Sequence, residues 1–199
     1  MRVRGLLAGV LGVALLAGGV TSCTSGDSSD STGPNTSTGS TVTLTQPSKP
    51  LTVKVEQLGG GVKKKDVASV KAAVAKPIAA WVGGGFLDPQ YPATDFDAAF
   101  ASWTPGAADL AKRDRDVTTN EALGSKLVAI VADRQSAKLY VFATHGTTGG
   151  ATAKVKLRFT GQLSDQSLVH FVVSGDLYLT RKDSQWQIFG YQLDREDVA

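Results

Sequence analysis

Cysteine and histidine are almost absent from this sequence, which has one cysteine and two histidines in 199 residues. A lone thiol cannot form an intramolecular disulfide. His145 and His170 are too far apart to form a recognisable zinc motif. The sequence also has no P-loop, no dinucleotide fingerprint and no Gly-x-Ser-x-Gly motif. We therefore expect no metal site and no cofactor.

The net charge is also small, at +3. Arg2 and Arg4 lie in an N-terminal segment that we expect to be removed, and without these two the 21 basic residues fall to 19, against 18 acidic ones. A nearly neutral chain has no electrostatic basis for neutralising a phosphate backbone. We therefore expect no nucleic-acid partner.

Residues 1–22 have the order of charge and hydropathy that is typical of a secretory signal peptide. Arg2 and Arg4 form the positive start, and an apolar stretch rich in glycine and alanine follows from Leu6 to Val20. This stretch of about 15 residues is shorter than the ~20 that a spanning helix needs. We expect a cleaved leader and no spanning helix here.

Val20-Thr21-Ser22-Cys23 resembles the bacterial lipobox, in which a small residue precedes an invariant cysteine. The resemblance implies that the Cys23 thiol is diacylated and that cleavage occurs just before it. Two or more acyl chains anchor a protein stably, whereas one chain is marginal. We expect a protein attached by lipid to the extracytoplasmic face of the cell membrane, with no thiol left for catalysis. The alternative is an ordinary signal peptide with a chance cysteine.

The next segments differ sharply in composition. Residues 23–50 are the predicted lipidated cysteine and tether, in which serine, threonine, glycine and proline dominate and aromatic residues are absent; such a stretch is expected to be disordered. Residues 51–61 contain a possible short strand, 51–56, and a glycine linker. That strand could pair with a sheet edge or simply end the tether. Residues 62–199 form the predicted folded domain.

The first part of this domain has a helical pattern. Asp66 is a plausible N-cap, and apolar residues then recur at spacings of three or four as far as Trp81. Pro77 should kink the helix or end it one turn early, and Gly83-Gly84-Gly85 should stop it. Two shorter helices are expected around 94–100 and from Thr104 onward.

The second part of the domain has the pattern of β-strands. We expect strands at 127–132 and 138–144 with a turn at 133–136, a loop at 146–150, and then three strands between Ala153 and Leu193. An apolar face on such a meander needs a cover, which the helices supply. The predicted fold class is therefore α+β, with N-terminal helices packed on a curved antiparallel meander sheet.

This order of elements resembles the nuclear transport factor 2-like superfamily, and most of all its actinobacterial lipoproteins. The residues that carry the resemblance are Tyr91-Pro92-x-x-Asp95-Phe96-x-x-Ala99-Phe100, Thr104-Pro105-Gly106-Ala107-Ala108 and Trp186-x-Ile188-x-Gly190-Tyr191. It implies a cone-shaped domain, in which a curved sheet wraps the long helix around an apolar cavity open at one end. The superfamily includes enzymes, ligand-binding modules and structural modules, so fold alone does not decide function.

Aromatic side chains of the helical half are the best candidates for lining such a cavity, although packing of the helices on the sheet explains them better. With the apolar face of the meander, the candidates are Trp81, Phe86, Tyr91, Phe100, Trp103, Val155, Leu157 and Phe159.

No residue stands out as catalytic. Cone-fold isomerases and cyclases need a buried acid or a His–Asp pair near the cavity. Here Asp165 and Asp183 fall in turns and Asp176 is expected to point outward, while His145 should face solvent and His170 should be half-buried. We therefore expect no catalytic residue and predict that the protein is not an enzyme.

Three functions remain open from the sequence. The first is an accessory or scaffold domain that docks on a cell-envelope protein; it predicts a filled core and an exposed apolar patch or β-edge. The second is a carrier or sensor of a small apolar or lipid ligand in the cone. The third is a small isomerase- or cyclase-like enzyme. Lys154, Lys156 and Arg158 on the outer sheet face argue against a dry dimer there.

Overall fold

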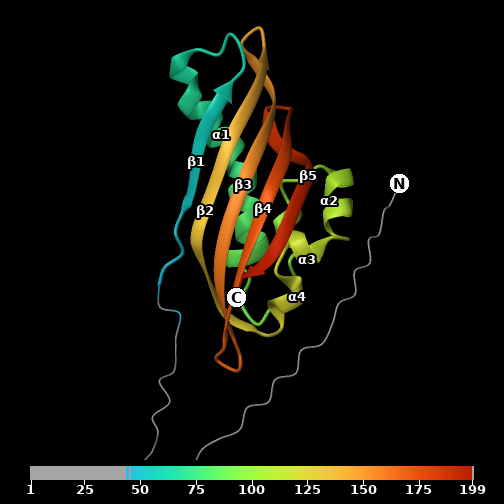
Figure 1. Cartoon of the computed structure of the whole chain (residues 1–199). Coiled ribbons are helices and arrows are strands. Elements are labelled where there is room, and N and C mark those ends of the chain that lie inside the picture. The colour runs from blue at the N-terminus through green and yellow to red at the C-terminus, as the bar shows by residue number, and fades with distance from the viewer. Residues whose placement is uncertain (1–43, 45, 199) are drawn as a thin grey trace, which may run out of the picture. The chain divides into compact units, whose positions relative to one another are not determined.

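The computed structural model describes Leu44 and residues 46–198. In this range the chain forms two layers, with helices lying against one face of a curved, unclosed sheet (Figure 1). The predicted α+β fold class is therefore confirmed. The predicted signal peptide, Cys23 and most of the tether lie outside the described residues.

The elements follow one another in the predicted order, helices before the meander. They are β1 (Leu51–Leu58), η1 (Lys64–Asp66), α1 (Val67–Val82), the π-helical turn η2 (Gly83–Leu87), η3 (Asp97–Phe100), α2 (Pro105–Ala111), α3 (Arg115–Thr118), α4 (Glu121–Gly124), β2 (Leu127–Thr144), β3 (Thr147–Leu163), β4 (Leu168–Lys182) and β5 (Gln185–Val198).

The sheet has the strand order β1-β2-β3-β4-β5. Strands β2 to β5 form an antiparallel meander, and β1 joins its edge parallel to β2, with Val53 opposite Ala137. The stretch predicted as a short strand therefore takes the first of its two alternatives and pairs with the sheet edge. A parallel pair needs a long crossover connection, and here that connection contains all the helices.

Contacts with β2 begin before β1, inside the stretch predicted as tether. The Lys49 amide donates to the Ala132 carbonyl at 2.8 Å, and the Ala132 amide donates to the Ser48 hydroxyl at 3.0 Å. The Gln135 side chain, which is 7% exposed, donates to the Lys49 carbonyl at 2.6 Å. These bonds satisfy buried polar groups on β2, which explains why a serine- and proline-containing segment lies along this strand.

Helix α1 has the predicted apolar stripe, because Val74, Ile78 and Trp81 are fully buried. Asp66 differs from its expected role, because it makes no capping hydrogen bond through its side chain. Of the two alternatives for Pro77, the early end is wrong, because the helix continues past its buried ring to Val82. The helix ends directly before Gly83, as predicted, and the coil then continues as η2. A Cβ on Gly84 would lie 2.6 Å from the Ala99 amide nitrogen, so this glycine permits close approach of η3.

Strand β2 is continuous, so the turn predicted at 133–136 is wrong. The polar residues there are held by bonds to distant parts of the chain: Asp133 accepts a hydrogen bond from the Thr160 hydroxyl at 2.8 Å, and a register shift next to Arg134 marks a bulge. The loop predicted at 146–150 is also wrong. His145 and Gly146 alone form the turn, both with positive φ, and β3 begins at Thr147.

Candidate functional site

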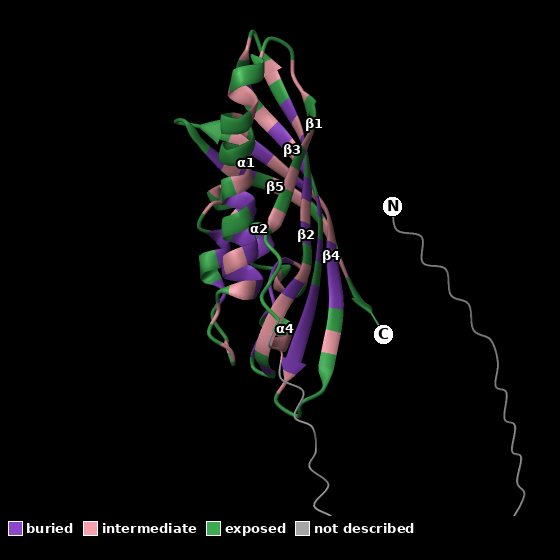
Figure 2. Cartoon of the chain, turned by 90° about the vertical axis from the view of Figure 1, so that its left-hand side faces the viewer, coloured by how far each residue is buried: buried purple, intermediate pink, exposed green. Residues whose placement is uncertain are grey.

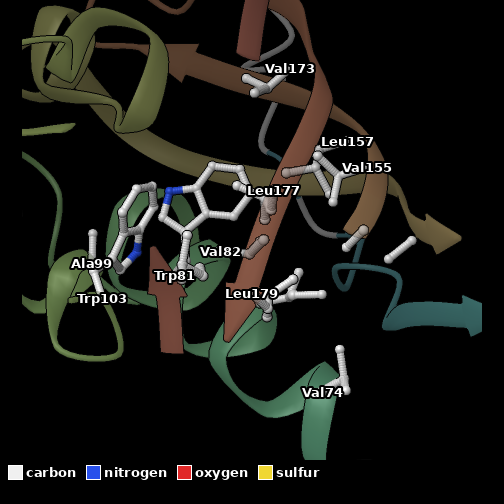
Figure 3. Close-up of a cluster of buried hydrophobic side chains, with 14 of the residues drawn as sticks. Val74, Trp81, Val82, Ala99, Trp103, Val155, Leu157, Val173, Leu177 and Leu179 are labelled. Atoms are coloured by element: carbon white, nitrogen blue, oxygen red, sulfur yellow. The ribbon is translucent and has the colours of Figure 1, made fainter. Parts of the chain in front are cut away.

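Aromatic and aliphatic side chains pack between the helices and the sheet (Figure 3). Buried residues recur along α1 and the strands (Figure 2). Phe86 stacks on Phe159 with ring centroids 4.9 Å apart, and Phe159 stacks on Phe171 at 5.1 Å. The rings of Trp81 and Phe86 are nearly perpendicular, with their centroids 5.7 Å apart. The helices are thereby held on the sheet by a chain of ring contacts.

The structure places the predicted lining residues inside this packed interior. Seven of the eight are buried and Tyr91 is partly buried. None of the eight lines any of five pockets found on the described part of the chain. Their contacts are those of core packing, and a role in lining a cavity stays a prediction.

The two buried tryptophans of this interior differ in how their indole N–H groups are satisfied. Trp81 donates to the Thr118 carbonyl at 2.8 Å, which joins α1 to α3. Trp103 has no hydrogen-bond partner for its Nε1 among the described residues, and its ring is surrounded by Phe100 at 5.7 Å and Tyr191 at 5.4 Å. The Trp103 N–H is therefore a buried donor that no acceptor among the described residues satisfies.

Arg195 is the principal polar group between β5 and the segment that contains α3 and α4. Its guanidinium lies 3.9 Å from the centre of the Phe171 ring. Nη1 donates to the carbonyls of Asp116 at 3.3 Å and Thr119 at 3.2 Å, and to Asn120 Oδ1 at 3.3 Å. Its side chain is only 11% exposed. Burial lowers the pKa of Arg195 from its usual value, but an arginine remains charged.

Tyr91 lies beside this group and is held by two hydrogen bonds. Its hydroxyl donates to the Phe86 carbonyl at 2.7 Å and accepts from Asn120 Nδ2 at 3.3 Å. Burial raises the pKa of Tyr91 to about 12, although the bond from Asn120 and the charge of Arg195 act in the opposite direction. The phenol is therefore neutral at ordinary pH and acts as a donor to the backbone.

A second polar pair lies where α2 meets β5. The Tyr191 hydroxyl donates to Asp114 Oδ2 at 2.6 Å, and burial together with the Asp114 charge raises the pKa of Tyr191. Both residues line a pocket of about 290 Å³, whose other walls are Ala107, Leu110 and Gly190. Sequence reasoning missed this pair, because its members lie 77 residues apart.

The largest of the five pockets lies elsewhere, between the edge strand β1 and helix α1. It has a volume of about 490 Å³. We call it the β1–α1 groove, and its lining residues are Leu51, Thr52, Val53, Ala68, Lys71, Ala72 and Ala75. The exposed alanines of α1 are the signal that could have indicated it, since larger side chains would fill the space.

The residues considered for acid–base roles lie away from the interior. His145 is exposed in its turn, as predicted, but His170 is also exposed, and the half-buried position expected for it is wrong. The Nδ1 atom of His170 lies 2.9 Å from the Thr160 hydroxyl. Asp176 is opposite Lys154 in the register and lies on the outer sheet face, as expected.

Two features are absent from the described residues. No group of three His, Cys, Asp or Glu side chains that could hold a metal ion occurs between residues 46 and 198. None of the helices that the structure describes is long and apolar enough to cross a membrane.

Comparison with known proteins gives a single named likeness. No protein-family model matches the chain, and no curated protein matches it. Among solved structures, the chain is similar to the crystal structure of a hexachlorocyclohexane dehydrochlorinase (LinA) Type2, with a TM-score of 0.45 and 11% sequence identity. The alignment covers 69% of this chain and 94% of the other. This likeness transfers neither a family nor a residue role to the chain.

The likeness corrects one expectation. We predicted from the sequence that the protein is not an enzyme, and that exclusion is wrong as stated, because the dehydrochlorinase with a similar fold is an enzyme. Function has to be argued from the sites of this chain.

Proposed function

We propose that the chain is an envelope protein, anchored by lipid on Cys23, that docks on a partner protein through the β1–α1 groove. The proposal rests on where the pockets lie in the described part of the chain. The interior is packed with side chains, whereas the largest of the five pockets, of about 490 Å³, opens beside a sheet edge.

The free edge of β1 supplies a mode of binding. This strand has a strand neighbour, β2, on one side only. Alternate residues Leu51, Val53 and Val55 are partly buried on the helix side, while their neighbours are exposed. An extended segment can add to such an edge through main-chain hydrogen bonds and place alternate side chains in a neighbouring groove. The groove beside Val53 fits this pattern.

Charge favours one kind of segment. Between residues 62 and 82 there are five lysines and one aspartate. Lys71 lines the groove itself, and Lys63, Lys64 and Lys65 lie exposed at the start of the helix. Opposite charges on two surfaces steer their encounter and suppress wrong partners. The occupant that fits is an extended acidic protein segment with apolar side chains at alternate positions.

The alanines of α1 allow a matched test. A photoreactive amino acid at position 72 lies in the groove, and the same group at position 80 lies on an exposed part of the same helix outside it. We expect cross-linking in intact cells from position 72 to one protein, through an acidic extended segment of that protein. The adduct should disappear when Ala68→Glu places a negative charge in the groove.

Two results would contradict the proposal. Equal cross-linking from positions 72 and 80 would show that the partner lies near the helix without binding in the groove. Adducts to lipid alone from position 72 would show that the lysine-rich helix faces the membrane surface. The full chain is used in every case, with Ala80→Glu as the matched charge control.

A further inference from the structure

Arg195 presents a buried charge that the described residues satisfy only in part. Its only ion pair there is with Asp197, whose carboxylate lies 4.0 Å from Nε and whose side chain is 89% exposed. All three hydrogen bonds of the guanidinium use Nη1, so Nη2 has no hydrogen-bond partner within the described part of the chain. Nη2 is not among the buried atoms without a partner, so it is accessible to solvent and can donate to an anionic group.

A pocket opens on this arginine. It has a volume of about 280 Å³ and is lined by Asp116, Val117, Ala122, Leu123, Arg195 and Asp197. The guanidinium is held rigidly, because Phe171 supports one face and three acceptors hold Nη1. A donor held in this way loses little conformational entropy when a ligand binds.

The charges around the pocket select among anions. Two carboxylates, Asp116 and Asp197, line the same pocket as the one cation. A dianion such as phosphate would be repelled by both carboxylates. A ligand with a carboxylate and an adjacent ammonium group matches the set, because its carboxylate can face Arg195 while its ammonium faces an aspartate.

The apolar walls indicate the rest of the ligand. Val117, Ala122 and Leu123 supply aliphatic surface in the pocket. A second pocket of about 290 Å³ shares Leu123 and Asp197 with the first and adds Leu168, Val169, His170 and Val198. Together they offer an apolar extension next to the charged group, which suits an aliphatic side chain.

We propose that the pocket between α3, α4 and β5 binds a small amino acid-like zwitterion with an aliphatic side chain, with Arg195 holding its carboxylate. The site is separate from the β1–α1 groove and shares no lining residue with it. Its occupation would tie β5 to the α3–α4 segment, which Arg195 already joins.

Three probes of one shape test the charge requirement. L-Leucine carries both groups, isocaproate lacks the ammonium group, and isopentylamine lacks the carboxylate. Chemical-shift titration of the full chain should show saturable shifts near Leu123 and Arg195 with L-leucine. Removing either charged group should weaken binding about tenfold or more, since a charged hydrogen bond is lost each time. Absence of saturable shifts with L-leucine, or equal binding of isocaproate, would overturn the proposal.

Three variants distinguish an effect on ligand binding from an effect on folding. Asp197→Asn should weaken the binding of L-leucine while leaving or improving that of isocaproate, because Asp197 is exposed and its loss removes only a negative charge. Asp194→Asn makes the same chemical change on β5 in a residue that lines none of the five pockets, and should leave both affinities unchanged. Equal effects of the two variants would overturn the proposed role of Asp197. Arg195→Lys keeps the charge but loses the planar fork, and should abolish the preference for a carboxylate.

Discussion

The two edges of the sheet are treated differently by the rest of the chain. At β5, Ile188 exchanges hydrogen bonds with the segment before α2: the Thr104 amide donates to its carbonyl at 2.8 Å, and its amide donates to the Ser102 carbonyl at 3.0 Å. Tyr191 and Arg195 add bonds further along the strand. The β1 edge has a groove instead, with exposed alanines of α1 beside it.

In one sheet, the β5 edge is therefore covered by other parts of the chain, whereas the β1 edge is left open. Unpaired strand edges invite pairing with other chains, and proteins cover or blunt those that they do not use. On β5 the cover comes from backbone and side chains of the helical segment. On β1 there is a bulge between Val55 and Gln57 and a run of charges, Lys54 and Glu56, which limit promiscuous pairing without filling the groove.

The largest expected contrast concerns stability. Ile188→Ala on the covered edge removes a fully buried side chain and should lower the free energy of unfolding by about 2–5 kcal/mol. Val53→Ala on the β1 edge is only partly buried, and should cost about 1 kcal/mol or less. Urea denaturation of the two variants measures the contrast, and equal losses would contradict the comparison.

Replacing the charge on each edge should give a smaller contrast. Arg195→Met leaves the acceptors of Thr119 and Asn120 unsatisfied, which should cost about 1–3 kcal/mol. Lys54→Met removes an exposed ion pair with Glu56 and should change stability by about 0.5 kcal/mol or less. Thermal denaturation at matched concentration compares them. A loss for Lys54→Met as large as that for Arg195→Met would show that Arg195 has no special role.

The stability of the fold should fall at alkaline pH because of Tyr91. Its pKa is raised from 10.0 to about 12 in the folded chain, chiefly by burial. The neutral phenol is therefore favoured by folding, and this contribution to stability is complete below pH 10 and is lost as pH rises from there through about 12. Tyr91→Phe should remove this part of the alkaline loss, whereas the part that comes from the raised pKa of Tyr191 should remain. Spectroscopic titration of phenolate checks the assignment, and an unchanged alkaline limb in Tyr91→Phe would contradict it.

The smallest stability effect is expected in the groove itself. Ala72→Trp should change the free energy of unfolding by about 0.5 kcal/mol or less, because residue 72 is exposed. With the photoreactive amino acid moved to position 68, which also lines the groove, the same variant should abolish partner cross-linking by filling the groove. Ala80→Trp is the matched control with the same chemistry outside the groove. Retention of partner binding in Ala72→Trp would show that docking uses another surface.

Local patterns predicted much of the fold but little of the candidate sites. The spacing of Val74, Ile78 and Trp81 indicated α1, and the alternation around Val155 to Phe159 indicated β3, because one face of each is buried. Asp133 to Ser136 looked like a turn, since polar residues usually interrupt strands. In the fold Asp133, Gln135 and Ser136 form hydrogen bonds with partners 20 or more residues away, which periodicity cannot show.

The site residues that the sequence did not indicate depend on long-range contacts. Arg195 meets Asn120 from 75 residues away, and its burial requires Phe171 on the neighbouring strand. The same limit applies to the β1–α1 groove, whose walls come from two elements that carry no shared motif. By contrast the aromatic residues were identified as a group, and the fold brings most of them together in the packed interior.

The most direct test of the central claim, that β1 is the open edge and β5 the covered one, is amide hydrogen exchange of the purified full chain. We expect slow exchange at the Ile188 amide, which is hydrogen-bonded to Ser102. Alternate amides of β1 that face away from β2 should exchange much faster, and should slow when the cross-linking partner binds. Uniformly slow exchange through Leu51–Leu58 in the isolated chain would contradict the account, because it would mean that this edge is already covered.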